Sequence, residues 1–286
     1  MFKSSVINIE ISNDIEQSLE FAQANGFESI EIHSAWNKNI EFMEKDELSL
    51  LDRLVKAHGL KVSCLSSTLF LRCFLDDRLD VVPEVRGFNA IPGDYNFHLR
   101  ALKQAFQAAE ILGAPVLRIF GFKKEDETTD EVFEMAAEKL RKPAEMAKEA
   151  GKILALENCP HTSFGWGVNT ARLVNMVNLP NLRMLWDPAG AVRAGEPDCI
   201  QAMPDIIPLL AHVHAKDIQP DSEADKRYMC IGKGVVPWPV IFGELIKQNY
   251  EGAISLETHF LGKDGLKSSA VLESRDAMLA MLSKFA

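Results

Sequence analysis

Four ionisable residues stand at the ends of short apolar stretches in the second half of the chain. They are Glu157 after KILAL, Asp187 after LRMLW, His214 within LLAHVHAKD and Glu257 after GAISL. A charged group at the end of an apolar stretch is costly unless it meets a cation or a hydrogen-bond partner. Three carboxylates and one imidazole form an oxygen-rich ligand set for one divalent metal ion. We expect Mn²⁺ first, with Mg²⁺, Co²⁺ or Zn²⁺ as alternatives.

Other polar residues stand in or just beyond similar apolar stretches. In a strand, residues two apart point the same way, so His212, His214 and Lys216 would project from one side. We expect Lys216 to stabilise an oxyanion at the rim and His212 to lie deeper, as a packing residue or a support for the ligands. Candidate substrate-binding histidines are His33, His161 and His259. Candidates for binding a carboxylate or phosphate are Arg118, Lys123, Lys216 and Arg193.

Each of these residues also has an ordinary structural explanation. Strand-end carboxylates often cap helices or form ion pairs, and a lone histidine in an apolar strand is usually a satisfied core residue. Four ionisable residues at equivalent strand ends favour one shared site over four separate structural roles.

Eight stretches rich in Val, Ile and Leu are expected to be the strands that position these residues. Their length and near-continuous hydrophobicity are typical of strands buried on both faces. They span residues 6–11, 29–33, 60–65, 115–122, 152–158, 182–187, 211–217 and 252–259.

Segments with helical periodicity lie between these strands. Examples are residues 15–26, 46–59, 97–114, 130–151, 170–179 and 238–252. Several of them end near a glycine, which suits a helix C-cap that leads into a strand. Eight strands alternating with helices predict an α/β fold, a (β/α)8 TIM barrel, whose chemistry lies at the carboxyl ends of the strands. An open doubly wound sheet is the alternative, although no GxGxxG follows the first strand.

We expect one domain over residues 1–286, because α/β barrels commonly reach this length. The interval between the third and fourth strands is longer than one helix needs. Residues 66–96 therefore predict a loop at the barrel mouth, either a lid or substrate wall, or a packing excursion or subunit contact.

Composition excludes several functions. A net charge of −10, a pI near 5.3 and the absence of Lys/Arg runs argue against a nucleic-acid partner. No apolar stretch approaches the roughly 20 residues of a membrane span. The five cysteines are scattered without CxxC spacing, which is typical of thiols in a reducing compartment. We therefore expect a cytoplasmic protein with a small-molecule substrate, and leave open whether it forms a homo-oligomer.

The motifs, in this order and spacing, resemble those of the sugar phosphate isomerase/epimerase family, the xylose-isomerase-like TIM barrels. The resemblance covers nearly the whole chain and rests on GFESIEIH, ALEN, LWDPAGAVRAGE, HVHAKD, GKGVVPW and ISLETH. It implies that the four predicted ligands bind one divalent metal. It also implies that Glu157 and Glu257 act as catalytic acid/base groups on opposite faces of a sugar.

This resemblance implies an isomerase or epimerase that acts on a keto-sugar or related polyhydroxy carbonyl compound through an enediolate. A metal-dependent dehydratase of an inosose or 3-keto-sugar is the alternative. A non-catalytic sugar-binding barrel and an apurinic endonuclease are further classes, but the acidic chain lacks the basic face that binds DNA.

The chain departs from the family at two positions. Many relatives carry His or Asn three residues beyond the aspartate, where this chain has Gly190. The keto-sugar epimerases also carry a second glutamate a few residues after the first, where this chain reads NCPHTSFGW. We expect His161 to substitute for that glutamate.

Overall fold

Eight parallel strands form the centre of the computed structural model, which describes residues 2–81, 89–219 and 228–285. The strands are β1 (Lys3–Val6), β2 (Ser29–Ile32), β5 (Lys61–Leu65), β6 (Val116–Phe120), β7 (Ile153–Glu157), β8 (Leu182–Trp186), β9 (Leu210–Ala215) and β12 (Ala253–Leu256). Their order is β1-β12-β9-β8-β7-β6-β5-β2. A parallel bridge between Ile7 and Glu31 joins the two ends of this order and closes the barrel. The predicted single-domain TIM barrel is confirmed.

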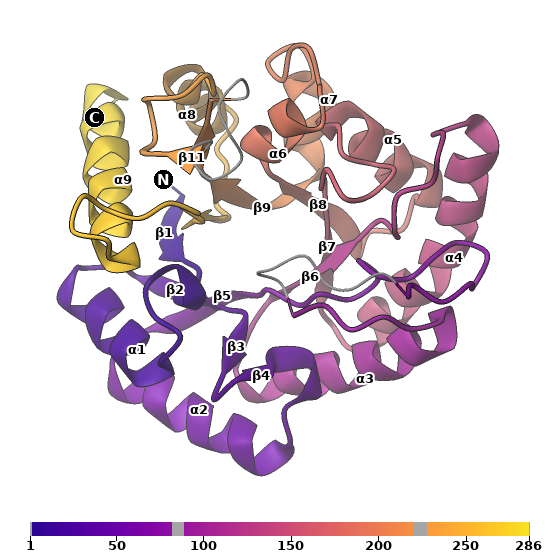
Figure 1. Cartoon of the computed structure of the whole chain (residues 1–286), viewed down its shortest axis with the longest axis horizontal. Coiled ribbons are helices and arrows are strands. Elements are labelled where there is room, and N and C mark those ends of the chain that lie inside the picture. The colour runs from indigo at the N-terminus through magenta and orange to yellow at the C-terminus, as the bar shows by residue number, and fades with distance from the viewer. Residues whose placement is uncertain (1, 82–88, 220–227, 286) are drawn as a thin grey trace.

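Helices form a ring outside the strands (Figure 1). They are α1 (Ile15–Ala24), α2 (Lys45–Ala57), α3 (Tyr95–Ile111), α4 (Asp130–Glu149), α5 (Gly167–Val177), α6 (Pro188–Arg193), α7 (Met203–Ile206), α8 (Trp238–Lys247) and α9 (Lys267–Leu282). Gly26, Gly59, Gly113 and Gly151 adopt positive φ just after α1 to α4, as predicted for helix C-caps. Helix α9 was not among the predicted segments, because its apolar and polar residues are not separated onto opposite faces.

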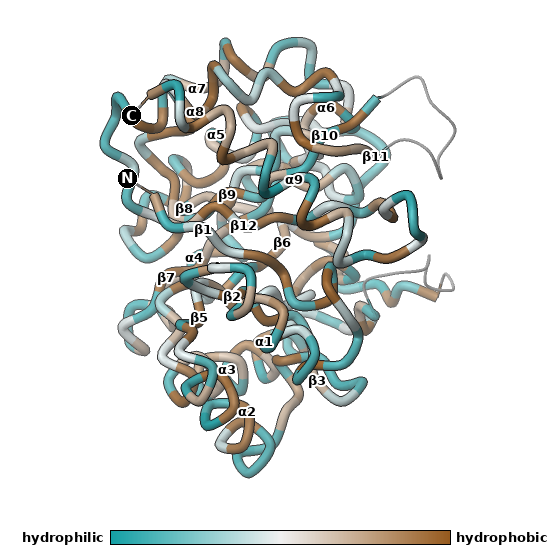
Figure 2. Tube along the Cα trace, turned by 90° about the vertical axis from the view of Figure 1, so that its left-hand side faces the viewer, coloured by the Kyte–Doolittle hydropathy of each residue, from teal (hydrophilic) through white to brown (hydrophobic). Residues whose placement is uncertain are grey.

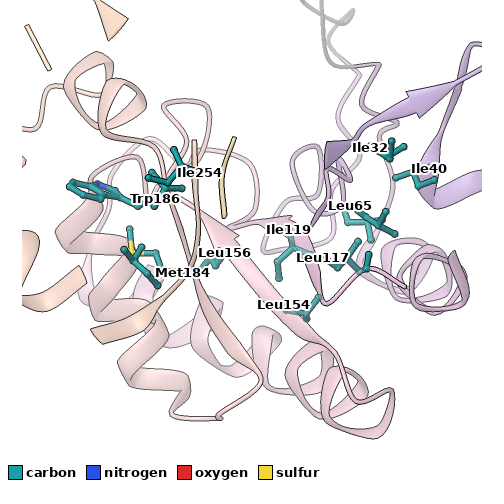
Figure 3. Close-up of a cluster of buried hydrophobic side chains, with 14 of the residues drawn as sticks. Ile32, Ile40, Leu65, Leu117, Ile119, Leu154, Leu156, Met184, Trp186 and Ile254 are labelled. Atoms are coloured by element: carbon teal, nitrogen blue, oxygen red, sulfur yellow. The ribbon is translucent and has the colours of Figure 1, made fainter. Parts of the chain in front are cut away.

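Alternation along the strands gives the barrel two buried faces. Leu154 and Leu156 belong to the large hydrophobic core between strands and helices, and Figure 3 shows them with residues of neighbouring strands. Ala155, between them in β7, belongs to a separate small cluster with Cys64, Val116 and Leu185. Hydrophobic residues accordingly recur along the strands in Figure 2. The inner set of positions ends at Glu157, so the pleat aims this side chain into the barrel mouth.

The first strand differs from its predicted position at residues 6–11. Strand β1 ends at Val6, and a 3-10 helix follows at Asn8–Glu10. The buried Asn8 side chain accepts the His33 backbone N–H at 2.8 Å and donates to the Ser34 carbonyl at 2.8 Å. These bonds turn the chain across the end of β2, so the alternating sequence VINIEI does not continue as a strand.

Two small hairpins lie beyond the barrel strands. One pairs β3 (Ser34–Ala35) with β4 (Lys38–Asn39), and the other pairs β10 (Asp217–Ile218) with β11 (Tyr228–Met229). The predicted mouth loop, residues 66–96, falls partly outside the described residues, at 82–88. In its described part, Leu71 and Ala90 pack with Phe120 and Cys159 near the ends of β6 and β7. The segment therefore borders the barrel mouth, and its function as a lid or wall stays a prediction.

All five cysteines are free and buried, in agreement with their spacing. In the parts of the chain that the structure describes, no helix combines the length and apolarity that crossing a membrane requires.

The buried His98 should make stability depend on pH. Its ring lies 5.3 Å from the rings of Phe70 and Phe97, and burial lowers its pKa to about 4. Between about pH 6.5 and 4 the unfolded chain binds a proton that the folded chain excludes, so stability falls as the pH falls, by at most about 3 kcal/mol. We expect His98→Asn to remove this part of the pH dependence in urea unfolding at pH 7, 5.5 and 4.5. Equal pH slopes in both proteins would contradict it.

Candidate functional site

The carboxyl ends of β7, β8, β9 and β12 bring the four predicted metal ligands together. Glu157 ends β7, while Asp187 and Glu257 directly follow β8 and β12. His214 Nδ1 lies 3.5 Å from Glu157 Oε1 and 3.1 Å from Glu257 Oε2. Atoms of these three residues that could bind a metal lie within 4.8 Å of one another. All four side chains are buried.

Asp187 joins this cluster through Lys216. The Lys216 ammonium lies 2.9 Å from Asp187 Oδ2 and also contacts Glu257 Oε2. The other Asp187 oxygen accepts the Gly190 N–H at 2.9 Å and thereby caps α6. A Cβ on residue 190 would lie 2.4 Å from Asp187 Oδ2, so this position cannot carry the larger side chain of many relatives without a local shift.

The cluster contains more negative charge than its burial tolerates without cations. Burial raises the pKa of Asp187, and Glu257 and Glu157 add to this effect while Lys216 opposes it. Burial would also raise the pKa of Glu257, but Lys216, His214 and His259 hold it well below its usual range. The ammonium group of Lys216 therefore offsets the negative charge of Asp187 and Glu257 within the cluster.

The residues present fit a divalent metal ion. Glu157 Oε2 and His214 Nδ1 are buried and make no well-aligned hydrogen bond among the described residues, although Arg118 lies 3.2 Å from the first atom and Glu257 lies 3.1 Å from the second. Carboxylate oxygens together with one imidazole nitrogen suit Mn²⁺, Mg²⁺, Co²⁺ or Zn²⁺. Glu157, His214 and Glu257 could hold such an ion. Asp187 lies next to these three residues, and Lys216 bridges Asp187 and Glu257.

Glu31 was missed as a functional candidate. Its Oε1 lies 3.1 Å from His214 Nε2 and its Oε2 lies 2.8 Å from His212 Nε2. His212, which also contacts Ser255 Oγ at 2.9 Å, lies deeper in the barrel than His214, as expected. A carboxylate on the second ring nitrogen holds a ligand histidine in a fixed orientation. The sequence offered one indication of this role, because Glu31 stands between Ile30 and Ile32 in a strand that is buried on both faces.

Glu31 and His212 also form, with Cys64, a second group that could hold a metal ion. Glu31 and His212 already satisfy each other by a hydrogen bond. We therefore interpret this deeper group as support for His214.

Glu10 was also missed, and it positions His259. Glu10 accepts the backbone N–H of His259 at 2.8 Å, and its other oxygen lies 2.9 Å from His259 Nδ1. His259 Nε2 in turn lies 3.4 Å from Glu257 Oε1, so this predicted pocket residue borders the cluster. Burial would raise the pKa of Glu10, but the neighbouring His259 lowers it to about 2. Burial would lower the pKa of His259, but the neighbouring Glu10 and Glu257 raise it to about 10.

The remaining predicted residues lie at different distances from the cluster. Arg118 is inside the barrel, where its guanidinium lies 3.2 Å from Glu157 Oε2 and donates to the carbonyls of Ser66 and Ser67. His33, just after β2, lies on the opposite side of the barrel from β8 and β9. His161 is exposed, and within the described ranges no hydrogen bond or ion pair joins its ring to any of the four ligands. Its substitution for the second glutamate stays a prediction.

The fold and this cluster define a TIM barrel with a candidate metal centre at the end where such barrels carry their chemistry. A family model described as xylose isomerase-like TIM barrel matches residues 19–276, so the chain belongs to this family. No curated protein matches the sequence.

Solved structures share the whole fold at low sequence identity. The IOLI protein with a bound zinc atom has a TM-score of 0.77 at 17% identity, over 100% of this chain and 99% of that one. The probable 3-DHS dehydratase AsbF from Bacillus anthracis has a TM-score of 0.71 at 20% identity, over 95% of this chain and 98% of that one. The 3-keto-D-glucoside 4-epimerase YcjR from E. coli has a TM-score of 0.71 at 17% identity, over 99% of this chain and 100% of that one. At such identities the likeness shows the fold.

Proposed function

We propose that the chain is a divalent-metal-dependent isomerase or epimerase of a keto-sugar or related polyhydroxy carbonyl compound. One observation carries the proposal: Glu157 and Glu257, from two different strands, approach the same nitrogen of His214 in a buried cluster. Two carboxylates beside one metal position are what proton removal and proton return next to a carbonyl require.

The chain's own residues supply the proton transfers. A divalent ion in the cluster would acidify the carbon-bound proton beside the carbonyl and stabilise the enediolate. Glu257 is kept deprotonated by its cationic neighbours, so it is in the protonation state that can accept a proton. Glu157 stands at the far end of the arc from β7 to β12 and is assigned to the other face of the substrate. Lys216 is assigned to the developing oxyanion.

A dehydratase is the second candidate function, supported by the structural likeness to AsbF. It would remove the same proton and then expel a β-hydroxyl group, so the product separates it from an isomerase or epimerase. The free thiols support our proposal that the enzyme is cytoplasmic.

Exchange in deuterated water tests the proposal. We expect metal-loaded protein to place deuterium beside the carbonyl of a substrate within a panel of keto-sugars and inososes. Label on the adjacent carbon indicates isomerisation, inversion at one carbon indicates epimerisation, and a deoxy or unsaturated product indicates dehydration. Protein stripped of metal is the control. A panel without exchange or turnover, with metal bound, would instead indicate a non-catalytic barrel.

A further inference from the structure

Among the residues that the structure describes, three buried polar atoms on the β2 and β5 side of the barrel have no hydrogen-bond partner. They are His33 Nε2, Glu41 Oε2 and Ser66 Oγ, from side chains no more than 2% exposed. Buried polar atoms are nearly always hydrogen-bonded in folded proteins. Three unsatisfied atoms in adjoining segments therefore point to a bound group that satisfies them.

The surrounding contacts determine what these atoms offer. His33 Nδ1 lies 2.8 Å from the Ser66 carbonyl, which can only accept, so Nδ1 carries the proton and Nε2 presents a lone pair. Burial and Arg118 lower the pKa of His33, which keeps the ring neutral. Glu41 Oε1 accepts the N–H and the hydroxyl of Thr68, at 2.9 and 2.6 Å, which leaves Oε2 as a second acceptor.

This group adjoins the metal cluster through Arg118. Arg118 Nη2 donates to the Ser66 carbonyl at 3.0 Å, while Nη1 lies 3.2 Å from Glu157 Oε2. One guanidinium therefore separates Ser66 from a predicted metal ligand. In the order of the sheet, β2 and β5 lie across the barrel from β8 and β9. A substrate that reaches both the metal cluster and these atoms must therefore span the interior of the barrel mouth.

We propose that His33, Glu41 and Ser66 form a subsite for the hydroxyl groups of an uncharged substrate tail. The proposal rests on the proposed function and specifies its substrate class as a free sugar rather than a sugar phosphate. Two acceptors and one hydroxyl call for a partner that donates hydrogen bonds. A phosphate has few protons to donate and would face the Glu41 carboxylate.

Of the candidate anion-binding side chains outside the cluster, Lys123 is already paired with a carboxylate, whereas Arg193 bonds to a neutral hydroxyl. The Lys123 ammonium lies 2.5 Å from Asp80 Oδ2. The Arg193 guanidinium donates to the Tyr228 hydroxyl at 2.9 Å.

Equilibrium binding to metal-loaded protein tests the subsite. The probes are D-fructose and D-ribulose, D-ribulose 5-phosphate, and dihydroxyacetone, which keeps the carbonyl and hydroxyl pair but lacks a tail. We expect wild type to bind a neutral ketose more tightly than either of the other two probes. Ser66→Ala and His33→Asn should each weaken ketose binding about tenfold and leave dihydroxyacetone binding unchanged. Asn keeps an N–H for the Ser66 carbonyl and removes the Nε2 acceptor.

Ser274→Ala is the control, because Ser274 Oγ is also buried and lacks a hydrogen-bond acceptor or donor in the described part of the chain, but lies on α9. Three results would overturn the subsite. The first is that wild type binds D-ribulose 5-phosphate more tightly than the neutral ketoses, and the second is that it binds no ketose more tightly than dihydroxyacetone. The third is that the variants lose the same affinity for the ketose as for dihydroxyacetone. Crystals soaked with the tighter ketose should show its hydroxyls at these atoms, and ordered water alone there would also overturn it. Deuterium exchange tests the proposed function separately from the subsite. If exchange occurs but the ketose binds no more tightly than dihydroxyacetone, only the subsite is refuted. If the ketose binds more tightly but no exchange occurs, only the proposed catalysis is refuted.

Discussion

Glu157→Gln and Glu257→Gln should each lower kcat by about 10² to 10⁴-fold, the range typical of a lost acid/base group. Glutamine keeps the shape of the side chain and one oxygen ligand but cannot take up a proton. The loss should therefore fall mainly on kcat, while KM changes less. Steady-state kinetics on the substrate found by deuterium exchange, with metal content measured in the same samples, checks this expectation.

Glu196→Gln is the control for this pair. Glu196 is a buried glutamate that accepts the N–H groups of Gly167 and Val168 at the start of α5, outside the cluster. We expect its kcat to stay near that of wild type. Metal-loaded Glu157→Gln and Glu257→Gln proteins that both turn over at the wild-type rate would refute the acid/base assignment.

Asp187→Ala and His214→Ala should each weaken metal binding more than about 100-fold, since even partners that only support a ligand are worth 10 to 100-fold. Asp187→Asn separates two functions of this side chain, because asparagine can still cap α6 through Gly190 but carries no charge. It should keep the stability of the helix and lose the metal. Elemental analysis of protein dialysed against buffered metal gives the stoichiometry, and retention of one equivalent by both alanine variants would eliminate the proposed centre.

Lys216→Met should act in the opposite direction. Lys216 lies between Asp187 and Glu257, so a divalent cation must compete with its ammonium group for these carboxylates. Methionine removes that competitor and leaves the carboxylates unpaired in the metal-free protein. We expect tighter metal binding and a lower Tm without metal, both measurable without any substrate.

The hydrophobic pattern was sufficient to predict the barrel. Near-continuous apolar strands require burial on both faces, and helices that alternate with them force parallel pairing, which brings all carboxyl ends to one end of the barrel. For this reason Glu157, Asp187, His214 and Glu257 could be placed together from their order alone. The extent of β1 could not, because the chain turns where Asn8 bonds to the backbone of His33 and Ser34, which local alternation does not reveal.

The sequence by itself determined the fold and the end of the barrel at which Glu157, Asp187, His214 and Glu257 lie. Only the tertiary structure decided how these side chains pair. Glu31 and His214 are 183 residues apart, and Glu10 and His259 are 249 apart, so no local pattern links them. Burial makes the pairing obligatory, because a carboxylate removed from water must find a donor wherever closure of the barrel places one. The same closure places Lys216 between Asp187 and Glu257, a position that the sequence indicated only as the rim.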